Sequence, residues 1–334
     1  MKTKLRFGSV CSGIEAASVA WPFWEAAWFS EIEPFPCAAL KHHYPDVPNH
    51  GDMTALPDRI LSGEVEAPDI FAAGTPCQAF SVAGNRKSLD DARGNLSLTF
   101  CEIADAIDSV RYVRNKQPTI IFWENVPGVL NTADNAFGCF LAKLAGESCE
   151  LQPPGGRWSD SGCVHGPKRT IAWRILDAQY FGLAQRRRRL YICAVQNSFR
   201  AVDSRKILFE FEGVRRDIKP WNEHEKTIHT TEANGIPFDM LGFGQYGTGM
   251  TASTILARDY KDAKDLVVTS DFRVRRLTPT ECERLQGFPD GYTNIPWRNK
   301  PEAPDGPRYK ALGNSWAVPV VNWIGNRINE ALNR

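Results

Sequence analysis

Short apolar runs alternate with helix-like stretches through the first half of the chain, and this alternation constrains the fold more than any other feature. Buried strands are predicted at residues 5–11, 27–32, 69–73 and 119–123, and helices at residues 14–24, 35–43 and 96–115. Strands that alternate with helices predict an α/β fold with a parallel sheet covered on both faces. Such sheets bind their ligands beyond the carboxyl ends of the strands.

The sequence changes character after about residue 195. Residues 200–264 are polar and glycine-containing, without a helical period, which predicts a small, loop-rich domain with short strands. We expect a larger domain at residues 1–196 and 312–334 and the small domain at residues 197–311. The Gly/Pro-rich insert at residues 153–168 is expected to lack regular structure.

Two helix starts are predicted in the last quarter of the chain. Thr278 precedes a proline at the first helical position, and Glu281 completes a capping box. Ser315 is expected to cap a last amphipathic helix that runs through Ile328 and packs back on the larger domain.

Composition excludes several classes of protein. The chain has 334 residues with a net charge of +1, and no apolar run is long enough to span a membrane. The nine cysteines include no Cys-x-x-Cys pair, so reduced thiols and a soluble, cytoplasmic protein are expected. Cys149, Cys163 and His165 could bind a metal, but free thiols in a surface loop suit their spacing better, and no metal is expected.

One cysteine follows a predicted strand directly. Residues 74–81 read Gly-Thr-Pro-Cys-Gln-Ala-Phe-Ser, so Cys77 sits on a turn at the ligand side of the sheet. A thiolate there could act as a nucleophile. A structural, buried cysteine is the alternative, and Cys77 alone does not decide between them.

An acid ends the next predicted strand in the same way. Glu124, in the string Glu-Asn-Val-Pro, emerges from an apolar run, and desolvation there would raise its pKa and keep it protonated. Capping a following helix is the alternative. The same sheet edge is predicted to carry Cys77 and Glu124, within reach of one bound group.

Together these strings resemble the motifs of the DNA (cytosine-5)-methyltransferase family, of prokaryotic or phage type. Pro-Cys-Gln and Glu-Asn-Val are joined, in that family's order, by four further strings at residues 7–15, 185–189, 276–289 and 313–315. The resemblance implies a Rossmann-like sheet that uses S-adenosylmethionine, with a small target-recognition domain. Each string is short, but six in the same order are very specific.

The resemblance implies a mechanism. Cys77 would add to C6 of cytosine, and protonated Glu124 would donate to ring N3, so that C5 could take a methyl group. Strand alternation puts Arg187 and Arg189 on one face and Arg186 and Arg188 on the other. By resemblance, the first pair faces the pocket with Arg189 near the cytosine O2, and the second pair meets solvent or phosphate.

The cofactor motif matches less closely. The family usually has Phe-x-Gly-x-Gly-Gly, whereas residues 11–16 read Cys-Ser-Gly-Ile-Glu-Ala. By resemblance, Glu31 would bind the ribose hydroxyls, with Ile32 and Asp52 at the adenine. Trp316 stands where the family commonly has valine. The predicted cofactor residues are Cys11, Gly13, Ile14, Glu31, Ile32, Asp52, Met53, Pro76, Leu96, Asn314 and Trp316.

DNA contacts are expected from two regions. The target base lies inside a duplex and must be flipped out, so the loop 78–95 is a natural lid and Arg93 a phosphate contact. Target recognition is expected in the small domain. The predicted DNA-binding residues are Gln78, Ser81, Arg93, Gln185 and Thr254.

Three functions remain open from the sequence. The first is methylation of double-stranded DNA by a monomer in the cytoplasm, associated with the nucleoid. It would act in a restriction–modification or phage-protection setting with a cognate restriction endonuclease. The second is tRNA cytosine methylation, since a related branch uses the same motifs. The third is a catalytically silent DNA-binding regulator, against which Cys77 and Glu124 argue.

Overall fold

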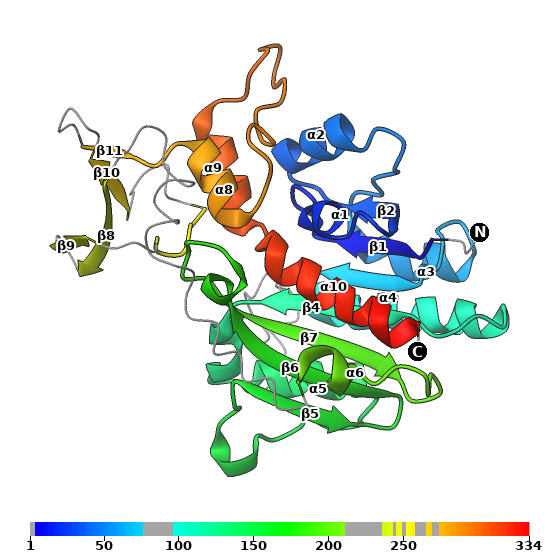
Figure 1. Cartoon of the computed structure of the whole chain (residues 1–334). Coiled ribbons are helices and arrows are strands. Elements are labelled where there is room, and N and C mark those ends of the chain that lie inside the picture. Colours follow the sequence, from blue (N-terminus) through cyan, green and yellow to red (C-terminus); the bar gives the residue numbers. More distant parts are fainter. Residues whose placement is uncertain are drawn as a thin grey trace.

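The computed structural model describes residues 4–75, 96–210, 236–242, 245–248, 252–257, 265–268 and 274–333. Within these ranges the chain forms a seven-stranded sheet and a four-stranded sheet. Figure 1 shows the small sheet at one end of the molecule, with α8 (Pro279–Gln286) and α9 (Asp305–Asn314) between it and the large sheet.

The large sheet has the strand order β2-β1-β3-β4-β7-β6-β5. Its strands are β1 (Arg6–Val10), β2 (Glu25–Ser30), β3 (Ile70–Ala73), β4 (Ile120–Asn125), β5 (Ser161–His165), β6 (Arg169–Asp177) and β7 (Arg188–Gln196). The four strands predicted in the first half of the chain run parallel, as expected. The last three extend the sheet in antiparallel pairs.

Helices cover both faces of this sheet. One core contains residues of α1 (Ala16–Ala20), α2 (Pro34–His43) and α10 (Val318–Leu332). The opposite core contains residues of α3 (Leu56–Leu61), α4 (Leu96–Val113) and α5 (Ala136–Ala145). All residues of β3 and β4 are buried, which explains why their sequences are apolar runs without alternation.

Short 3₁₀ turns and one further helix complete the larger unit. They are η1 (Met53–Ala55), η2 (Pro127–Asn131), η3 (Pro154–Gly156), η4 (Ala178–Phe181) and α6 (Ser204–Leu208). Of the helices that the structure describes, none is long and apolar enough to cross a membrane.

Several local predictions are wrong. The helix expected at residues 14–24 shortens to α1, because Glu15 adopts a left-handed conformation and becomes its N-cap. Ser315 ends α9 instead of capping α10, whose N-cap is Ala317 with no side-chain bond. The insert at residues 153–168 contains β5, which pairs with β6 and so gains order from a distant partner. The capping box of Thr278 and Glu281 is confirmed.

The small sheet is antiparallel and has the order β11-β10-β8-β9. Its strands are β8 (Ile236–Gly242), β9 (Gln245–Thr248), β10 (Leu266–Val268) and β11 (Val274–Arg276). The chain to either side of these strands packs with the large sheet, since Leu208 of α6 and Leu285 of α8 belong to its core. The predicted small domain at residues 197–311 therefore includes helices that pack on the larger unit.

Candidate active site

The ends of β3 and β4 lie side by side, because Ala73 pairs with Trp123. Glu124 follows at the end of β4 and is only 7% exposed. Beyond Thr75 the chain enters residues 76–95, which lie outside the described residues. The predicted site residues in that segment are Pro76, Cys77, Gln78, Ser81 and Arg93, and their roles stay predictions.

Thr75 ties the two strand ends together. Its hydroxyl accepts a hydrogen bond from Trp123 Nε1 at 2.9 Å and lies 3.0 Å from Ser97 Oγ in the first turn of α4. Its carbonyl accepts a bond from the side-chain amide of Asn125 at 2.9 Å. Thr75 and Ser97, which flank residues 76–95 in the sequence, therefore meet beside the strand that carries Glu124.

Glu124 forms an ion pair with Arg189. Its Oε1 lies 3.1 Å from Arg189 Nε, and both side chains are about nine-tenths buried. Arg189 precedes Tyr191 by two residues on β7, and Tyr191 is the cross-strand partner of Glu124, so all three side chains share one face of the sheet. Among the described residues Oε1 has no partner in hydrogen-bond geometry, which leaves it able to bind a further group.

Burial raises the pKa of Glu124, because the charged carboxylate loses solvation. The positive charges of Arg189 and Arg187 and the indole N–H of Trp316 act in the opposite direction, in that order of size. The raised pKa means that the carboxyl group keeps its proton to higher pH than an ordinary glutamic acid. A protonated acid can give its proton to a bound base.

Arg187 is buried and binds backbone carbonyls of distant segments. It is 2% exposed, and its guanidinium donates to the carbonyls of Ile255 at 3.3 Å, Gly313 at 3.2 Å and Ser315 at 2.5 Å. Burial lowers its pKa to about 9. Its guanidinium thus holds three backbone segments together, while the predicted substrate contact stays a prediction. The predicted strand alternation is confirmed, since Arg186 and Arg188 are exposed.

Gln185 is fully buried and binds backbone on two sides. Its side-chain amide donates to the carbonyl of Leu285 at 2.8 Å and accepts a bond from Ile255 N at 3.2 Å. This arrangement leaves it no surface for the predicted DNA contact. Thr254 is partly exposed, and its hydroxyl donates to the carbonyl of Arg186 at 2.5 Å. Both residues therefore dock residues 252–257 on the larger unit.

The loop after β1 has the features of a cofactor cradle. Gly13 has a φ of +59°, and no atom lies within 4 Å of the position that a Cβ would take. Its backbone N–H donates to Glu31 Oε2 at 2.8 Å, while Glu31 Oε1 accepts from the N–H groups of Ile32 and Glu33. The open space above Gly13 and the fixed carboxylate fit a ribose whose hydroxyls donate to Glu31.

The other predicted cofactor residues that the structure describes differ in exposure and in contacts. Ile32 is 70% exposed although apolar, which suits a surface for an adenine ring. Cys11 Sγ lies 3.9 Å from the sulfur of the buried Met53, and Asp52 caps the turn that follows by accepting a bond from Thr54 N. Ile14 contributes its side chain to the core instead of the surface. Asn314 is exposed and Leu96 half-buried.

Trp316 links the cofactor motif with the acid. Its ring stacks edge-on against Phe122 of β4 at 5.1 Å, and its indole N–H interacts with Glu124. A Cβ on Gly74 would lie 2.6 Å from Trp316 Nε1, so only glycine lets the ring approach the backbone there. The unusual tryptophan thus contacts the ends of both catalytic strands.

The sequence analysis did not predict that Glu15 is a buried acid that caps α1. This glutamate is fully buried, takes a φ of +63°, and accepts bonds from Ser9 Oγ at 2.9 Å and Ser18 N at 3.2 Å. Burial raises its pKa to about 8. An acid in a position that is glycine in the resembled motif was the signal that could have identified it.

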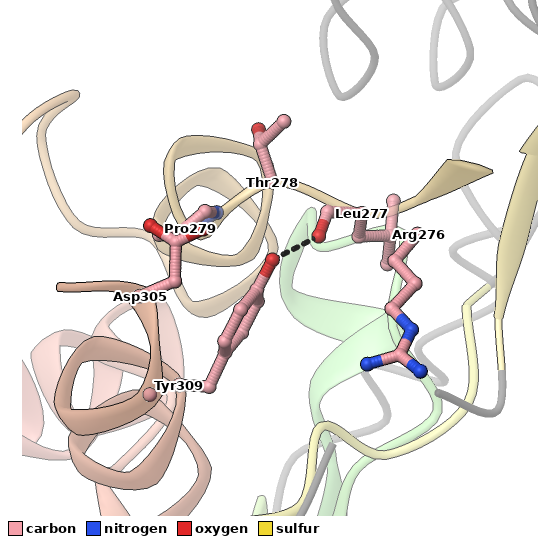
Figure 2. Close-up of a pocket in the computed structure, with 7 residues that line it drawn as sticks. Arg276, Leu277, Thr278, Pro279, Asp305 and Tyr309 are labelled. Atoms are coloured by element: carbon pink, nitrogen blue, oxygen red, sulfur yellow. Dashed lines mark hydrogen bonds between the residues drawn. The ribbon is translucent and has the colours of Figure 1, made fainter. Parts of the chain in front are cut away.

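The described residues also form a cavity of about 460 Å³ away from these side chains. Figure 2 shows it between the start of α8 and α9, where Tyr309 donates a hydrogen bond to the carbonyl of Leu277. None of its lining residues was predicted as a site residue. Among the described residues no cluster of His, Cys, Asp or Glu could hold a metal ion.

Comparisons with known proteins agree with this geometry. Residues 5–240 and 210–330 match a family model described as C-5 cytosine-specific DNA methylase. Type II methyltransferase M.HhaI of Haemophilus parahaemolyticus is 25% identical over 354 residues, which cover 99% of this chain and 96% of that protein.

A more similar relative has a different name. A protein of Escherichia phage P1 named DNA N-6-adenine-methyltransferase is 41% identical over 468 residues, which cover 99% of this chain. The chain spans only 62% of that protein. Among solved structures, Dnmt2 methyltransferase of S. pombe has a TM-score of 0.68 at 18% identity, covering 99% of this chain and all of the other, which shows the shared fold.

Proposed function

Because the chain belongs to the C-5 cytosine-specific DNA methylase family, we propose that it methylates C5 of a flipped-out cytosine in a specific duplex DNA sequence through a covalent adduct with Cys77. The methyl donor is S-adenosylmethionine. The observation that carries the proposal is the buried Glu124, paired with Arg189 at the end of β4, which lies beside the end of β3. A nearly buried acid with an oxygen that, among the described residues, has no partner in hydrogen-bond geometry suits recognition of a ring nitrogen.

The chemistry requires a nucleophile and an acid on one base. C5 of cytosine is too weakly nucleophilic to take a methyl group unaided. Addition of the Cys77 thiolate at C6 forms an S–C6 bond and moves the ring electrons toward C5, while Glu124 gives its proton to N3. After C5 is methylated, loss of the C5 proton to a base restores the C5–C6 double bond and expels the thiolate, and N3 returns its proton to Glu124.

The remaining residues hold these groups in position. Arg189 keeps the Glu124 side chain against the sheet, and we assign it the cytosine O2 as a second contact. Asn125 fixes the carbonyl of Thr75, the last described residue before the Pro-Cys turn. Correct placement of reacting groups can raise a rate by several orders of magnitude. We therefore propose that the contacts of Arg189 with Glu124 and of Asn125 with Thr75 contribute to catalysis.

The chain's own residues fit the methyl donor. When bound, S-adenosylmethionine supplies an electrophilic sulfonium methyl. Gly13 and Glu31 would hold its ribose and Ile32 its adenine, since these residues offer the open space, the fixed carboxylate and the exposed apolar surface described above. Asn314, the last residue of α9, and Trp316, which precedes α10, would close the site from the other side.

The proposal also covers the DNA-recognising region and the oligomeric state. We propose that the small sheet and residues 252–257 recognise DNA and that the protein acts as a monomer. Flipping one base costs a few kcal/mol, which contacts across both units would offset. A cognate restriction endonuclease fits the Type II relatives.

Adenine methylation is a second candidate, because the phage P1 relative carries that name. An exocyclic amine needs no thiol addition to a ring carbon, so the pairing of Cys77 with Glu124 favours cytosine. Incubation with labelled donor and unmethylated DNA or tRNA, followed by nucleoside analysis, separates the candidates. We expect 5-methylcytosine in DNA; N6-methyladenine, labelled tRNA or no label in either nucleic acid would contradict the proposal.

A further inference from the structure

Arg187 joins three parts of the chain that are far apart in sequence. Its guanidinium donates to the carbonyl of Ile255, which lies 68 residues away, and to those of Gly313 and Ser315, which lie 126 and 128 residues away. Since Arg187 is 2% exposed, these bonds form without competition from water. No carboxylate oxygen forms an ion pair with it among the described residues, so the three carbonyls carry its hydrogen bonding.

Residues 252–257 are held against the larger unit by a row of backbone and side-chain bonds. Arg186 N donates to the carbonyl of Ala252 at 2.9 Å, and Ala252 N donates to the carbonyl of Ala184 at 2.7 Å. Gln185 accepts from Ile255 N. Each of these bonds has one partner in residues 184–187. This short segment therefore holds residues 252–257 in position.

Residues 256–257 pack directly on the last turn of α9. A Cβ on Gly313 would lie 2.2 Å from Ala257 N and 2.3 Å from the Leu256 carbonyl carbon. The two backbones therefore touch at Gly313, and Arg187 bonds to both sides of that contact. Movement of either segment would break charge-assisted bonds of a buried group, which are among the strongest of hydrogen bonds.

From this geometry we infer that Arg187 is a positioning residue that couples methyl-donor binding to DNA binding. The inference rests on the proposed function, which assigns Asn314 and Trp316 to the donor and residues 252–257 to DNA. A ligand that orders either segment also orders the carbonyls that hold the other. The second ligand then binds to a site that is already arranged, so each ligand strengthens binding of the other.

Coupling of this kind is reciprocal and measurable without catalysis. S-adenosylhomocysteine, which has no methyl group to transfer, serves as the donor-side probe. The DNA probe is a duplex selected by wild-type protein from random sequences in the presence of S-adenosylhomocysteine. The ratio of the S-adenosylhomocysteine Kd without and with this duplex gives the coupling factor, expected to be roughly 5- to 150-fold. S-adenosylhomocysteine should tighten DNA binding by the same factor.

The decisive variant is Arg187→Lys, with Arg186→Lys as the matched control. Lysine has no planar fork and cannot reach three carbonyls, so the coupling factor should fall toward 1. The control changes an exposed neighbour in the same way and should keep the wild-type factor. Gly313→Ala tests the same contact without altering Arg187, because its Cβ would force residues 256–257 away, and it should also lower the factor.

The result can go against the inference in several ways. A coupling factor of 1 in the wild-type protein would overturn it. So would a coupling factor in Arg187→Lys or in Gly313→Ala that equals that of the wild type. If the arginine variant does not fold, the Gly313→Ala result decides. Production of 5-methylcytosine by a wild type without coupling would contradict the inference and leave the proposed function standing. A protein that selects no duplex would contradict both.

Discussion

Glu124 Oε1 lies 3.1 Å from Arg189 Nε, and the pair closes the end of β4 where the chain turns toward the site. The oxygen has no partner in hydrogen-bond geometry among the described residues. A ring nitrogen of a bound ligand can supply the missing hydrogen-bond partner of this buried, ion-paired carboxyl group.

Replacement of this acid should remove most of the rate. Glu124→Gln keeps the shape but cannot deliver a proton, so kcat should fall by roughly 10²- to 10⁴-fold. Donor affinity should change little, because Glu124 is not among the cofactor residues. Single-turnover methylation measures the rate, and Glu302→Gln, an exposed glutamate, is the matched control. A Glu124→Gln rate equal to that of the wild type would remove Glu124 from the mechanism.

Trp316 should tune the pH profile of the same acid. Its indole N–H lowers the pKa of Glu124, so Trp316→Phe should raise that pKa while the ring still packs on Phe122. Because the proposed mechanism uses the protonated form of Glu124, activity should be lost as pH rises through this pKa. The alkaline limb should therefore move to higher pH in the variant at saturating donor. An alkaline limb that stays in place would show that the indole N–H does not act on Glu124.

Glu15 should make stability depend on pH. Its pKa is about 8 in the folded protein, against 4.5 for an ordinary glutamate. Between these values the folded state binds a proton that the unfolded state lacks, so stability falls as pH rises, by at most about 1.4 kcal/mol per pH unit. Glu15→Gln should lack this fall. Urea unfolding at pH 5 and pH 8 measures it, and equal pH slopes in both proteins would contradict the assignment.

The hydrogen bond from Asn125 to the carbonyl of Thr75 should contribute to both stability and rate. Asn125→Asp keeps the acceptor for Val126 N but loses the donor to the carbonyl of Thr75. The loss of this buried bond should cost about 1–3 kcal/mol of stability. The rate should fall as well, since Thr75 leads into the Pro-Cys segment. If the urea midpoint and kcat both match those of the wild type, the tether has no role.

Local sequence patterns predicted those structural features that depend mainly on neighbouring residues in the sequence. The apolar runs of β3 and β4 predicted buried parallel strands, and the same runs placed Glu124 at their edge. Period-two alternation separated Arg186 and Arg188, which are exposed, from Arg187 and Arg189. Thr278 and Glu281 marked a helix start because both partners of the capping box lie within four residues.

Features that depend on distant partners could not be predicted. The partners of Arg187 lie 68 to 128 residues away, so nothing near it distinguished a buried tether from a pocket residue. β5 forms because β6 pairs with it, although its own sequence resembles a loop. Ser315 looked like a helix cap, but Pro319 lies in the first turn of α10 and the helix begins later, at Val318.

The central claim is that the sulfur of Cys77 bonds to a cytosine ring, and a mechanism-based trap tests it most directly. In DNA synthesised with 5-fluorocytosine in place of cytosine, C5 carries fluorine instead of a removable proton, so the thiolate cannot be expelled after methyl transfer. With S-adenosylmethionine present, we expect a covalent protein–DNA complex whose modified peptide maps to Cys77, and none with Cys77→Ala. Absence of the complex from DNA that the protein binds would contradict the account.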